Sequence, residues 1–501
     1  MFSRFPRYLN PPDHLMDKVY WILTSILFLT DLTIRIGLSV RVIMRKKEPS
    51  VTLAWLVVIL LLPFLGAIIY LLFGENRLGE RRARRAAADI PLILRWAEKL
   101  RQRSFVDWNL INPECEPLHR QIDTAIGIPT MPGNSISLIE NSSDFFRRLI
   151  IDIENAKSTC FLEFYIFAAG GHADQVCTAL KKASRRGVCC KLLLDSIGSK
   201  EFLAGSQCRD LQAHGIQVLE CLPAGLFRAL FVRIDLRNHR KIVTIDNTIA
   251  YTGSQNLVDP RFFKQDEGVG QWIDIMVRVK GPVVEILTAS FLYDWALETG
   301  RPLEQLIMEA KVQPIPDMGE IPVQLAPSGP GYAEGTIHNL LLTTIYAARR
   351  ELILTTPYFV PDNAILVALK SAAQRGVVVT IIVPAKNDSR LVHYASRARY
   401  GELIAAGVRI VGFTKGLLHA KTITVDNDFC LIGSVNLDMR SFWLNFEMTL
   451  FVYNDGFTSR IRQLQRNYLQ ASSPLNELVF KKRSFKERFL ENMALLVGPL
   501  L

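Results

Sequence analysis

The sequence is poor in paired cysteines. Its 501 residues include eight cysteines, none of them spaced as Cys-x-x-Cys, and only Cys189 and Cys190 are adjacent. This spacing argues against a disulfide framework and against a zinc site. The thiols are therefore expected to be reduced and mostly buried, as is typical of a cytosolic compartment.

Two further features are missing. No group of histidine, aspartate and glutamate residues has the spacing of a metal site, so we expect neither a metal nor another cofactor. No small-residue cleavage site follows the first apolar stretch, and a second apolar stretch comes directly after it. These observations exclude a cleaved signal peptide.

The overall composition points to a membrane and to an anionic partner. Hydrophobic residues make up 49% of the chain, which is high for a purely soluble protein. The net charge of +11 favours nucleic acid, phosphate esters or an acidic membrane surface as partner. The length allows two to four structural units.

Two long apolar stretches open the chain. Val51–Phe73 carries no charge and is long enough to span a bilayer as one helix. Val19–Met44 is interrupted by Asp31 and Arg35, which lie four residues apart and are expected to pair on one helical face. We predict a transmembrane helical hairpin within residues 1–75. Its basic flanks favour cytoplasmic ends, and basic residues in the connection leave a shallow re-entrant hairpin as an alternative.

Basic segments lie on either side of the central part of the chain. Residues 76–135 are predicted to form a basic amphipathic helix, from Glu80 to about Arg103, followed by a connector. Residues 471–501 form a tail in which Phe480–Leu496 combines an apolar stripe with five basic residues. That stripe either packs on the domain or lies on anionic lipid.

One polar pattern occurs twice in the chain. Histidine, lysine, aspartate, glycine, serine and asparagine recur at identical spacing, with β-prone apolar residues between them. The first copy contains His239, Lys241, Asp246, Gly253, Ser254 and Asn256, and the second contains His419, Lys421, Asp426, Gly433, Ser434 and Asn436. Each copy predicts a hairpin that turns at the aspartate and displays the other polar groups together.

The pattern around each copy is that of an α/β fold. Strand, helix, strand, helix and hairpin follow one another in both halves, and Arg-Gly-Val occurs at both helix-to-strand junctions. We place the first repeat at residues 136–300, a proline-rich linker at 301–322 and the second repeat at 323–470.

The duplicated residues suit phosphodiester chemistry. One histidine can attack phosphorus while uncharged, and the other can protonate the departing alkoxide. The lysines and asparagines, with the serines as further candidates, can stabilise the charge on the non-bridging oxygens without a metal.

A nucleophilic histidine also needs a carboxylate to orient it. One acid stands among apolar residues in a predicted strand beyond each copy, Asp274 in the first half and Glu447 in the second. We assign Asp274 to His239 and Glu447 to His419. Asp246 and Asp426 lie in the predicted turns, with opposite parity from the histidines, and are interpreted as structural.

The duplicated pattern resembles the His-x-Lys-x4-Asp-x6-Gly-Ser-x-Asn signature of the phospholipase D superfamily. The layout of nearly the whole chain is similar to that of bacterial cardiolipin synthases of the phospholipase D type, including Pro49–Trp55 and Gly74–Gly79 in the N-terminal part. The resemblance implies two α/β sandwich repeats related by a pseudo-two-fold axis, with one composite site and no obligate oligomer. The histidine, lysine and aspartate of each copy would be its catalytic signature.

The same resemblance implies a reaction and a location. A phosphatidyl group would pass from one phosphatidylglycerol to the glycerol headgroup of another through a phosphohistidine, giving cardiolipin and glycerol. His239, in the N-terminal copy, would be the nucleophile. The protein would lie in the bacterial inner membrane as a multi-pass protein, with its catalytic repeats on the cytoplasmic side and anionic phospholipids as partners.

Three alternatives remain at this point. A phospholipase D hydrolase would share every catalytic residue and use water as acceptor. A membrane-bound nuclease would fit the basic charge, but the apolar hairpin counts against it, so no nucleic-acid partner is expected. An anionic-lipid-binding scaffold with a vestigial site is disfavoured because both signatures are complete. The use of phosphatidylethanolamine as a substrate stays open.

Overall fold

The computed structural model describes residues 14–45, 49–75, 79–223, 233 and 235–496. These divide into two compact units. The described residues of the N-terminal unit form α1 (His14–Met44), α2 (Pro49–Leu61) and α3 (Leu65–Phe73). The second unit, which begins at Leu78, contains every strand described below.

The prediction of a single helix over Val51–Phe73 is wrong. The segment is broken between α2 and α3, next to Pro63. Proline lacks the backbone N–H that would continue the helix, and its ring clashes with the preceding turn. Phe64 takes a positive φ of 52°, which completes the break. Within the described residues, no helix is both long and apolar enough to cross a membrane.

Two charged residues of α1 stabilise this break. Asp31 and Arg35 form the predicted ion pair. Asp31 accepts a hydrogen bond from the Phe64 backbone N–H at 2.9 Å, and Arg35 donates to the Leu60 carbonyl at 2.7 Å. An unbroken helix would join this N–H and this carbonyl to each other. The charges in the apolar segment therefore satisfy the backbone groups that the break releases.

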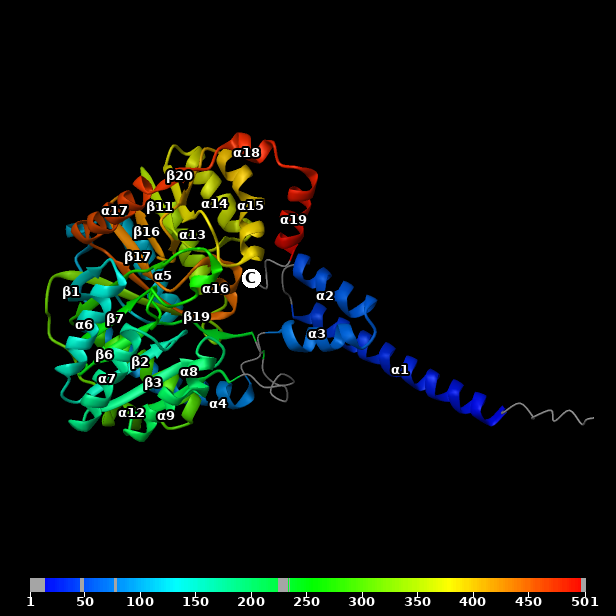
Figure 1. The fold of residues 1–501 in the computed structure, drawn as a ribbon, viewed down its shortest axis with the longest axis horizontal. Coiled ribbons are helices and arrows are strands. Elements are labelled where there is room, and N and C mark those ends of the chain that lie inside the picture. Colours follow the sequence, from blue (N-terminus) through cyan, green and yellow to red (C-terminus); the bar gives the residue numbers. More distant parts are fainter. Residues whose placement is uncertain (1–13, 46–48, 76–78, 224–232, 234, 497–501) are drawn as a thin grey trace, which may run out of the picture. The chain divides into compact units, whose positions relative to one another are not determined.

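The second unit is built on a mixed sheet whose strand order is symmetric. The strand order along the sheet is β20-β14-β13-β11-β16-β17-β19-β10-β1-β9-β7-β6-β2-β3-β4. From β14 on one side and β4 on the other, corresponding strands of the two repeats follow one another inward. They meet at the antiparallel β10–β1 pair. The strands of the first repeat are β1 (Met131–Ile139), β2 (Thr159–Phe164), β3 (Cys189–Asp195), β4 (Gln217–Cys221), β6 (Ile242–Ile245), β7 (Ile249–Gly253) and β9 (Met276–Lys280). Those of the second are β10 (Ile321–Ser328), β11 (Glu351–Thr355), β13 (Val378–Pro384), β14 (Arg409–Phe413), β16 (Thr422–Val425), β17 (Phe429–Gly433) and β19 (Asn445–Val452). Figure 1 shows the first repeat in cyan and green and the second in yellow and orange.

Helices cover both faces of this sheet. In the first repeat, α6 (Ser142–Glu154) and α7 (His172–Arg185) share one apolar core with the strands. In the second repeat, α13 (Thr336–Ala347) and α14 (Asn363–Gln374) share another. The long helices α11 (Val283–Thr299) and α17 (Asp455–Gln470) contribute to a third core that contains strands of both repeats. The repeats are therefore one continuous structure, in agreement with the predicted α/β class.

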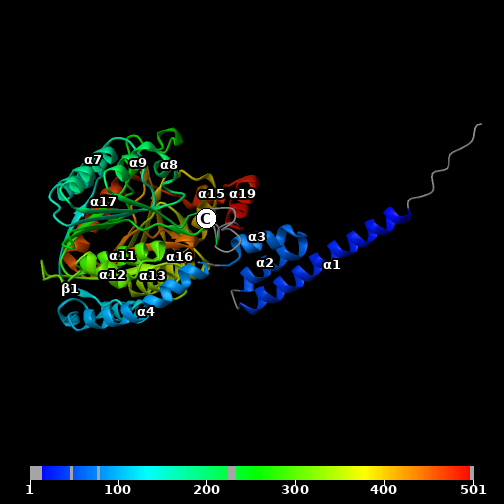
Figure 2. The same cartoon turned by 90° about the horizontal axis from the view of Figure 1, so that it is seen from below.

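Several boundaries differ in detail from the expected ones. β1 begins at Met131, inside the expected connector, and the expected linker contains α12 (Leu303–Glu309). The expected basic helix is α4 (Glu80–Arg101), and the connector also contains α5 (Glu116–Ile126). α4 lies beside α11 and α12 in Figure 2. Short helices in proline-rich segments are hard to predict because proline is tolerated in the first helical turn.

The C-terminal tail both packs on the domain and leaves an apolar stripe exposed. It contains β20 (Ser472–Pro474), α18 (Glu477–Lys481) and α19 (Phe485–Leu496). Glu491 of α19 is buried and forms ion pairs with Arg397 and Arg483. Phe485 and Phe489 remain exposed. Packing on the domain is thus confirmed for one face of the helix, and contact with anionic lipid stays a prediction for the other.

Candidate active site

The two predicted hairpins are confirmed. β6 and β7 are joined at Asp246–Asn247, and β16 and β17 at Asp426–Asn427. All four turn residues have positive φ, a conformation that Asp and Asn adopt more readily than other non-glycine residues. Each hairpin carries the histidine and lysine before its first strand and Ser-x-Asn after its second.

The signature aspartates bind backbone groups at the turn end of the hairpins. Asp246 accepts the backbone N–H groups of Lys157, Ser158 and Thr159 at 2.7–2.9 Å. Asp426 accepts three successive backbone N–H groups, of residues 349–351, at 2.7 Å each. Both carboxylates therefore fix the start of a neighbouring strand, β2 or β11, which is the structural role expected of them.

The signature glycines allow two strands to approach closely. A Cβ atom at Gly253 would lie 2.4 Å from the carbonyl oxygen of Ile275. At Gly433 it would lie 2.2 Å from the carbonyl oxygen of Met448. Any larger residue would separate β7 from β9, or β17 from β19, and would displace the serine that follows.

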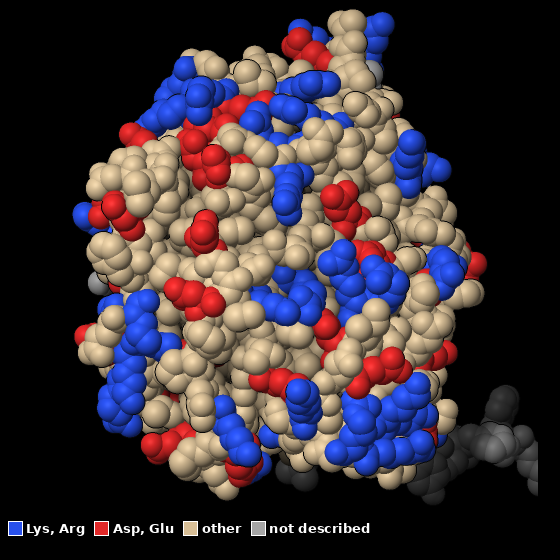
Figure 3. All heavy atoms as spheres, turned by 90° about the vertical axis from the view of Figure 1, so that its left-hand side faces the viewer, with Lys and Arg blue, Asp and Glu red and all other residues tan. Residues whose placement is uncertain are grey.

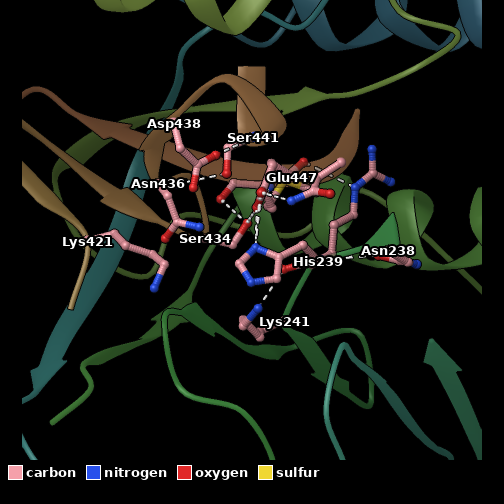
Figure 4. Close-up of polar contacts among 12 residues, drawn as sticks. Asn238, His239, Lys241, Lys421, Ser434, Asn436, Asp438, Ser441 and Glu447 are labelled. Carbon is pink, nitrogen blue, oxygen red and sulfur yellow. Dashed lines mark hydrogen bonds and ion pairs between the residues drawn. The ribbon is translucent and has the colours of Figure 1, made fainter. Parts of the chain in front are cut away.

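The assignment of each acid to the histidine of its own repeat is wrong. His239 Nδ1 lies 2.8 Å from a carboxylate oxygen of Glu447, and His419 Nδ1 lies 2.7 Å from Asp274. Each histidine therefore pairs with the acid of the other repeat. Figure 4 shows Glu447 on one side of the His239 ring and Lys241 on the other.

Short parallel strand pairs between the repeats explain this crossing. β5 (Arg237–Asn238) pairs with Asn445–Phe446 at the start of β19, and β15 (Leu417–Leu418) pairs with β8 (Trp272–Ile273). The next residue along each pair is a histidine on one strand and an acid on the other. The His239 N–H donates to the Phe446 carbonyl at 2.9 Å, and the His419 N–H donates to the Ile273 carbonyl at 2.8 Å.

The signature serines hold the acids. Ser254 donates its hydroxyl hydrogen to Asp274 at 2.6 Å, and Ser434 donates to Glu447. Each hydroxyl also accepts a backbone N–H, from Ile275 or Met448, at 3.0 or 2.9 Å. The serines therefore position the carboxylates, and the expectation that they contact a phosphate oxygen is not supported by these bonds.

The signature asparagines leave polar atoms available. Asn256 is buried and accepts the Ile166 N–H at 3.2 Å, while its Nδ2 has no partner in the part of the chain that the structure describes. In the second repeat, Oδ1 of buried Asn436 is likewise unpartnered among the described residues. A buried amide without a partner costs free energy, which a bound phosphate group would recover at Asn256.

Burial makes the two histidines neutral. Desolvation lowers the pKa of His239 to about 4 and that of His419 to about 3, although each faces a carboxylate. The lysine of the other signature contributes to the lowering in both cases. Lys421 thus acts on His239 and Lys241 on His419, so the two signatures share one site.

The two lysines are also buried and weakly basic. Each donates to the carbonyl of its own histidine at 2.7 Å. Desolvation lowers the pKa of Lys241 to about 7 and that of Lys421 to about 8. Binding of an anionic phosphate between them would restore their charge, because an opposite charge favours the protonated form.

The carboxylates fix the histidine tautomers. Burial acts to raise the pKa of Glu447, but His239, Lys241 and Ser434 outweigh it, so the net pKa lies below its ordinary value. An ionised carboxylate can only accept, so Nδ1 of His239 must carry the proton. Its Nε2 is then an unprotonated nitrogen suited to nucleophilic attack.

Several residues of the site were not singled out from the sequence. Asn445 donates to Glu447 at 3.2 Å, and Trp272 packs its ring 4.4 Å from that of His419. Arg240, between His239 and Lys241, is fully buried and pairs with Asp294. The position of Arg240 between two candidate site residues was the sequence signal that could have identified it. Tyr165 and Tyr358, which the sequence places at the ends of matched strands, pack on His239 and His419 in T-shaped contacts with ring centroids 5.0 and 6.3 Å apart.

The described residues contain no group of three or more His, Cys, Asp or Glu side chains that could hold a metal ion. The site brings together two imidazoles, two carboxylates and two ammonium groups on a duplicated α/β frame. This combination defines the phospholipase D class.

Comparisons with known proteins agree with this class and narrow it. The family described as "Cardiolipin synthase, PLD-like domain" matches residues 149–295 and 341–468, and "Phospholipase_D-nuclease N-terminal" matches residues 34–75. Cardiolipin synthase A of Yersinia pseudotuberculosis serotype O:3 (strain YPIII) is 44% identical over 482 residues, which cover 96% of this chain and 97% of the relative. Cardiolipin synthase A of Yersinia pestis gives the same values.

One solved structure supports the fold. The phosphatidylserine synthase of Haemophilus influenzae Rd KW20 has a TM-score of 0.58 at 15% sequence identity, covering 77% of this chain and all of that one. The chain belongs to the cardiolipin synthases of the phospholipase D superfamily, and is thus a phosphatidyltransferase.

Proposed function

We propose that the chain transfers a phosphatidyl group from one phosphatidylglycerol to the glycerol headgroup of a second, releasing glycerol and forming cardiolipin. The observation that carries this proposal is the crossed pair of histidine–carboxylate contacts at one buried site, in a member of the cardiolipin synthase family. Two imidazoles held in this way can divide nucleophilic attack and proton transfer between them.

In the first step, Nε2 of His239 attacks phosphorus and the bond from phosphorus to the glycerol oxygen breaks. Protonated His419 gives its Nε2 proton to the departing glycerol. We assign attack to His239, whose side chain is the more exposed of the two, at 9% against 3% for His419. The N-terminal copy is also the usual nucleophile in the enzymes this chain resembles.

In the second step, neutral His419 accepts the proton of a glycerol hydroxyl on the second phosphatidylglycerol. That oxygen attacks phosphorus, the bond between nitrogen and phosphorus breaks, and His239 is regenerated. Lys241 and Lys421, with Nδ2 of Asn256, stabilise the non-bridging oxygens as charge develops in both steps. Glu447 and Asp274 orient the two imidazoles throughout.

Substrate binding supplies the charge state that the first step needs. His419 is neutral in the free site because burial lowers its pKa to about 3. A phosphodiester brought beside it adds a negative charge, which raises the pKa of an imidazole. His419 can then be the proton donor only when substrate is present, which limits unproductive protonation.

The proposed location is the inner membrane of a bacterium, with the N-terminal unit in the lipid and the second unit on the cytoplasmic side. Large apolar side chains of α1 are exposed over several turns, including Trp21, Leu27 and Phe28. All eight cysteines are free thiols, which suits a reducing compartment. The double crossing that the sequence predicts stays a prediction, with a hairpin that enters from one side as its alternative.

The same site could also serve a hydrolase or a nuclease. The face seen in Figure 3 has basic and acidic side chains intermixed, whereas a nucleic-acid surface gathers basic residues in a continuous stripe. Incubation of purified protein with phosphatidylglycerol labelled in both glycerol groups tests the proposal. Equal amounts of cardiolipin and glycerol are expected. Phosphatidic acid with glycerol would identify a hydrolase, and DNA or RNA cleavage without lipid turnover a nuclease.

A further inference from the structure

A cavity lies beneath α4 in the second unit, apart from the candidate active site. It has a volume of about 330 Å³ and is lined by residues of α4, α11, α12 and the segment before α13. Figure 2 shows α4 running along this side of the unit. Most of the lining is aliphatic or aromatic, and includes Ile90, Leu92, Ile93, Trp96, Leu303 and Ile307. Such a volume and lining are typical of a site for an apolar ligand.

One part of the cavity wall is polar. Arg82, Tyr293 and Tyr332 contribute to the lining. The guanidinium of Arg82 is buried, pairs with Glu298 and lies 5.1 Å from the centre of the Phe446 ring. A ligand that fits this wall has a long apolar body and a polar group that accepts hydrogen bonds.

Two lining residues of α4 are also exposed to solvent. Ile90 is 52% exposed and Leu94 is 62% exposed, so the cavity opens along this helix. Exposed arginines at positions 81, 84 and 95 stand on the same helix. These arginines stand away from the opening round the helix and make the outer side of α4 basic, which favours contact with an anionic lipid surface.

The cavity is separated from the reacting groups by one strand. Phe446 lines the cavity, and its carbonyl accepts the His239 N–H at 2.9 Å. Glu447, the next residue of β19, points to the opposite face and contacts His239. A molecule in the cavity therefore contacts the residue next to Glu447 without reaching the histidines.

We propose that this cavity binds one acyl chain of an anionic membrane phospholipid, distinct from the lipid whose phosphate reacts. The apolar lining suits a hydrocarbon chain, the polar wall suits its ester group, and the basic outer side of α4 suits the surface of an anionic membrane. α4 also follows directly in the chain after the apolar helices α1–α3. The inference goes beyond the proposed reaction, since binding in the cavity requires no turnover.

Photo-crosslinking tests this site. Phosphatidylglycerol with a diazirine in the middle of one acyl chain is added in vesicles to the full-length protein, irradiated and mapped by peptide mass spectrometry. Labelling is expected on the peptides of α4 and α11. The His419→Ala variant should be labelled equally, which separates binding in the cavity from the proposed reaction.

Two substitutions and a matched control make the test specific. Ala86→Trp fills the cavity from α4, and Ile90→Asp places a charge at its exposed opening. Each should lower labelling by about tenfold or more, because methylenes would lose their apolar contacts. Ala87→Trp adds the same side chain to an exposed position of α4 that does not line the cavity, and should leave labelling unchanged.

Three results would overturn the proposal. Labelling that avoids α4 and α11 would place the acyl chain elsewhere. Equal labelling in Ile90→Asp, whose exposed position does not endanger folding, would show that the cavity is not used. Stronger labelling by a free diazirine fatty acid than by the phospholipid at equal concentration would assign the site to fatty acids.

Discussion

At the scale of single residues, each imidazole depends on a carboxylate from the other repeat. His239 is held by Glu447 and His419 by Asp274. Each carboxylate in turn accepts a hydrogen bond from the signature serine of its own repeat. A histidine, an acid and a serine are therefore linked across the two repeats in two places. Glu447 thus orients the proposed nucleophile, and Asp274 orients the proposed proton donor.

Replacing the acids one at a time tests this crossing. Glu447→Gln and Asp274→Asn should each lower kcat by roughly 10²–10⁴-fold with phosphatidylglycerol, since loss of an orienting acid has effects of that order. A donor with a good leaving group departs without an acid. It should restore much of the first step, measured as the burst of released leaving group, in Asp274→Asn but not in Glu447→Gln. The opposite pattern of rescue would mean that each acid acts within its own repeat, or that His419 attacks.

The buried lysines predict an alkaline limit to activity. Burial lowers the pKa values of Lys241 and Lys421 to about 7 and 8, so both lose their positive charge as the pH rises through this range. The value of kcat/KM, which reports the free enzyme, should therefore fall above about pH 7–8. Arginine stays charged throughout this range.

Lys241→Arg tests that assignment. The variant should be less active at neutral pH but should show its alkaline fall at higher pH than the wild type. Lys370→Arg, on the surface of α14 and paired with Glu402, is the control and should leave the profile unchanged. An unaltered alkaline limb in Lys241→Arg would assign that limb to another group.

At the scale of elements, the break between α2 and α3 depends on Asp31 and Arg35 of α1, which bind the backbone groups that the break releases. Asp31→Leu removes the acceptor of the Phe64 N–H. An unsatisfied buried donor costs about 1–3 kcal/mol, so hydrogen exchange in the peptide around Phe64 should become about tenfold faster or more. Asp31→Asn keeps an acceptor oxygen and serves as the control. Equal exchange in the wild type and in Asp31→Leu would show that the contact does not stabilise the break.

The elements of the catalytic unit could be predicted because their signals are local. The spacing of His239, Lys241 and Asp246 predicts a hairpin, and glycine marks the helix-to-strand junctions in both halves. The break next to Pro63 also had a local signal, since proline is unfavourable within a helix. It was outweighed by the uninterrupted apolar composition of Val51–Phe73.

The pairing of acids with histidines could not be predicted in the same way. Asp274 and Glu447 recur at equivalent places, and that recurrence is compatible with pairing inside a repeat or between repeats. The choice is made by β5 pairing with β19 and β15 with β8. The histidine–acid contacts that result join residues 145 and 208 positions apart. The residue pattern within one repeat therefore could not predict them.

At the scale of the whole molecule, one chain supplies both halves of one site. The sheet order is symmetric about the β10–β1 pair, and the crossed contacts join the two repeats at the centre. Activity therefore should not require a second copy. A mixture of His239→Ala and His419→Ala proteins should remain as inactive as either alone, because each chain lacks one histidine of its own site. Recovery of activity on mixing would require a site shared between chains.

The central claim is that His239 carries the phosphatidyl group while His419 transfers the proton. Brief incubation with phosphatidylglycerol, an acid-free quench and peptide mapping test it most directly. The phosphatidyl adduct is expected on the peptide that contains His239. It should accumulate in His419→Ala when the donor has a good leaving group, since that group departs without an acid. An adduct on His419 in the wild type would reverse the roles, and cardiolipin formation by the His239→Ala protein would contradict the account.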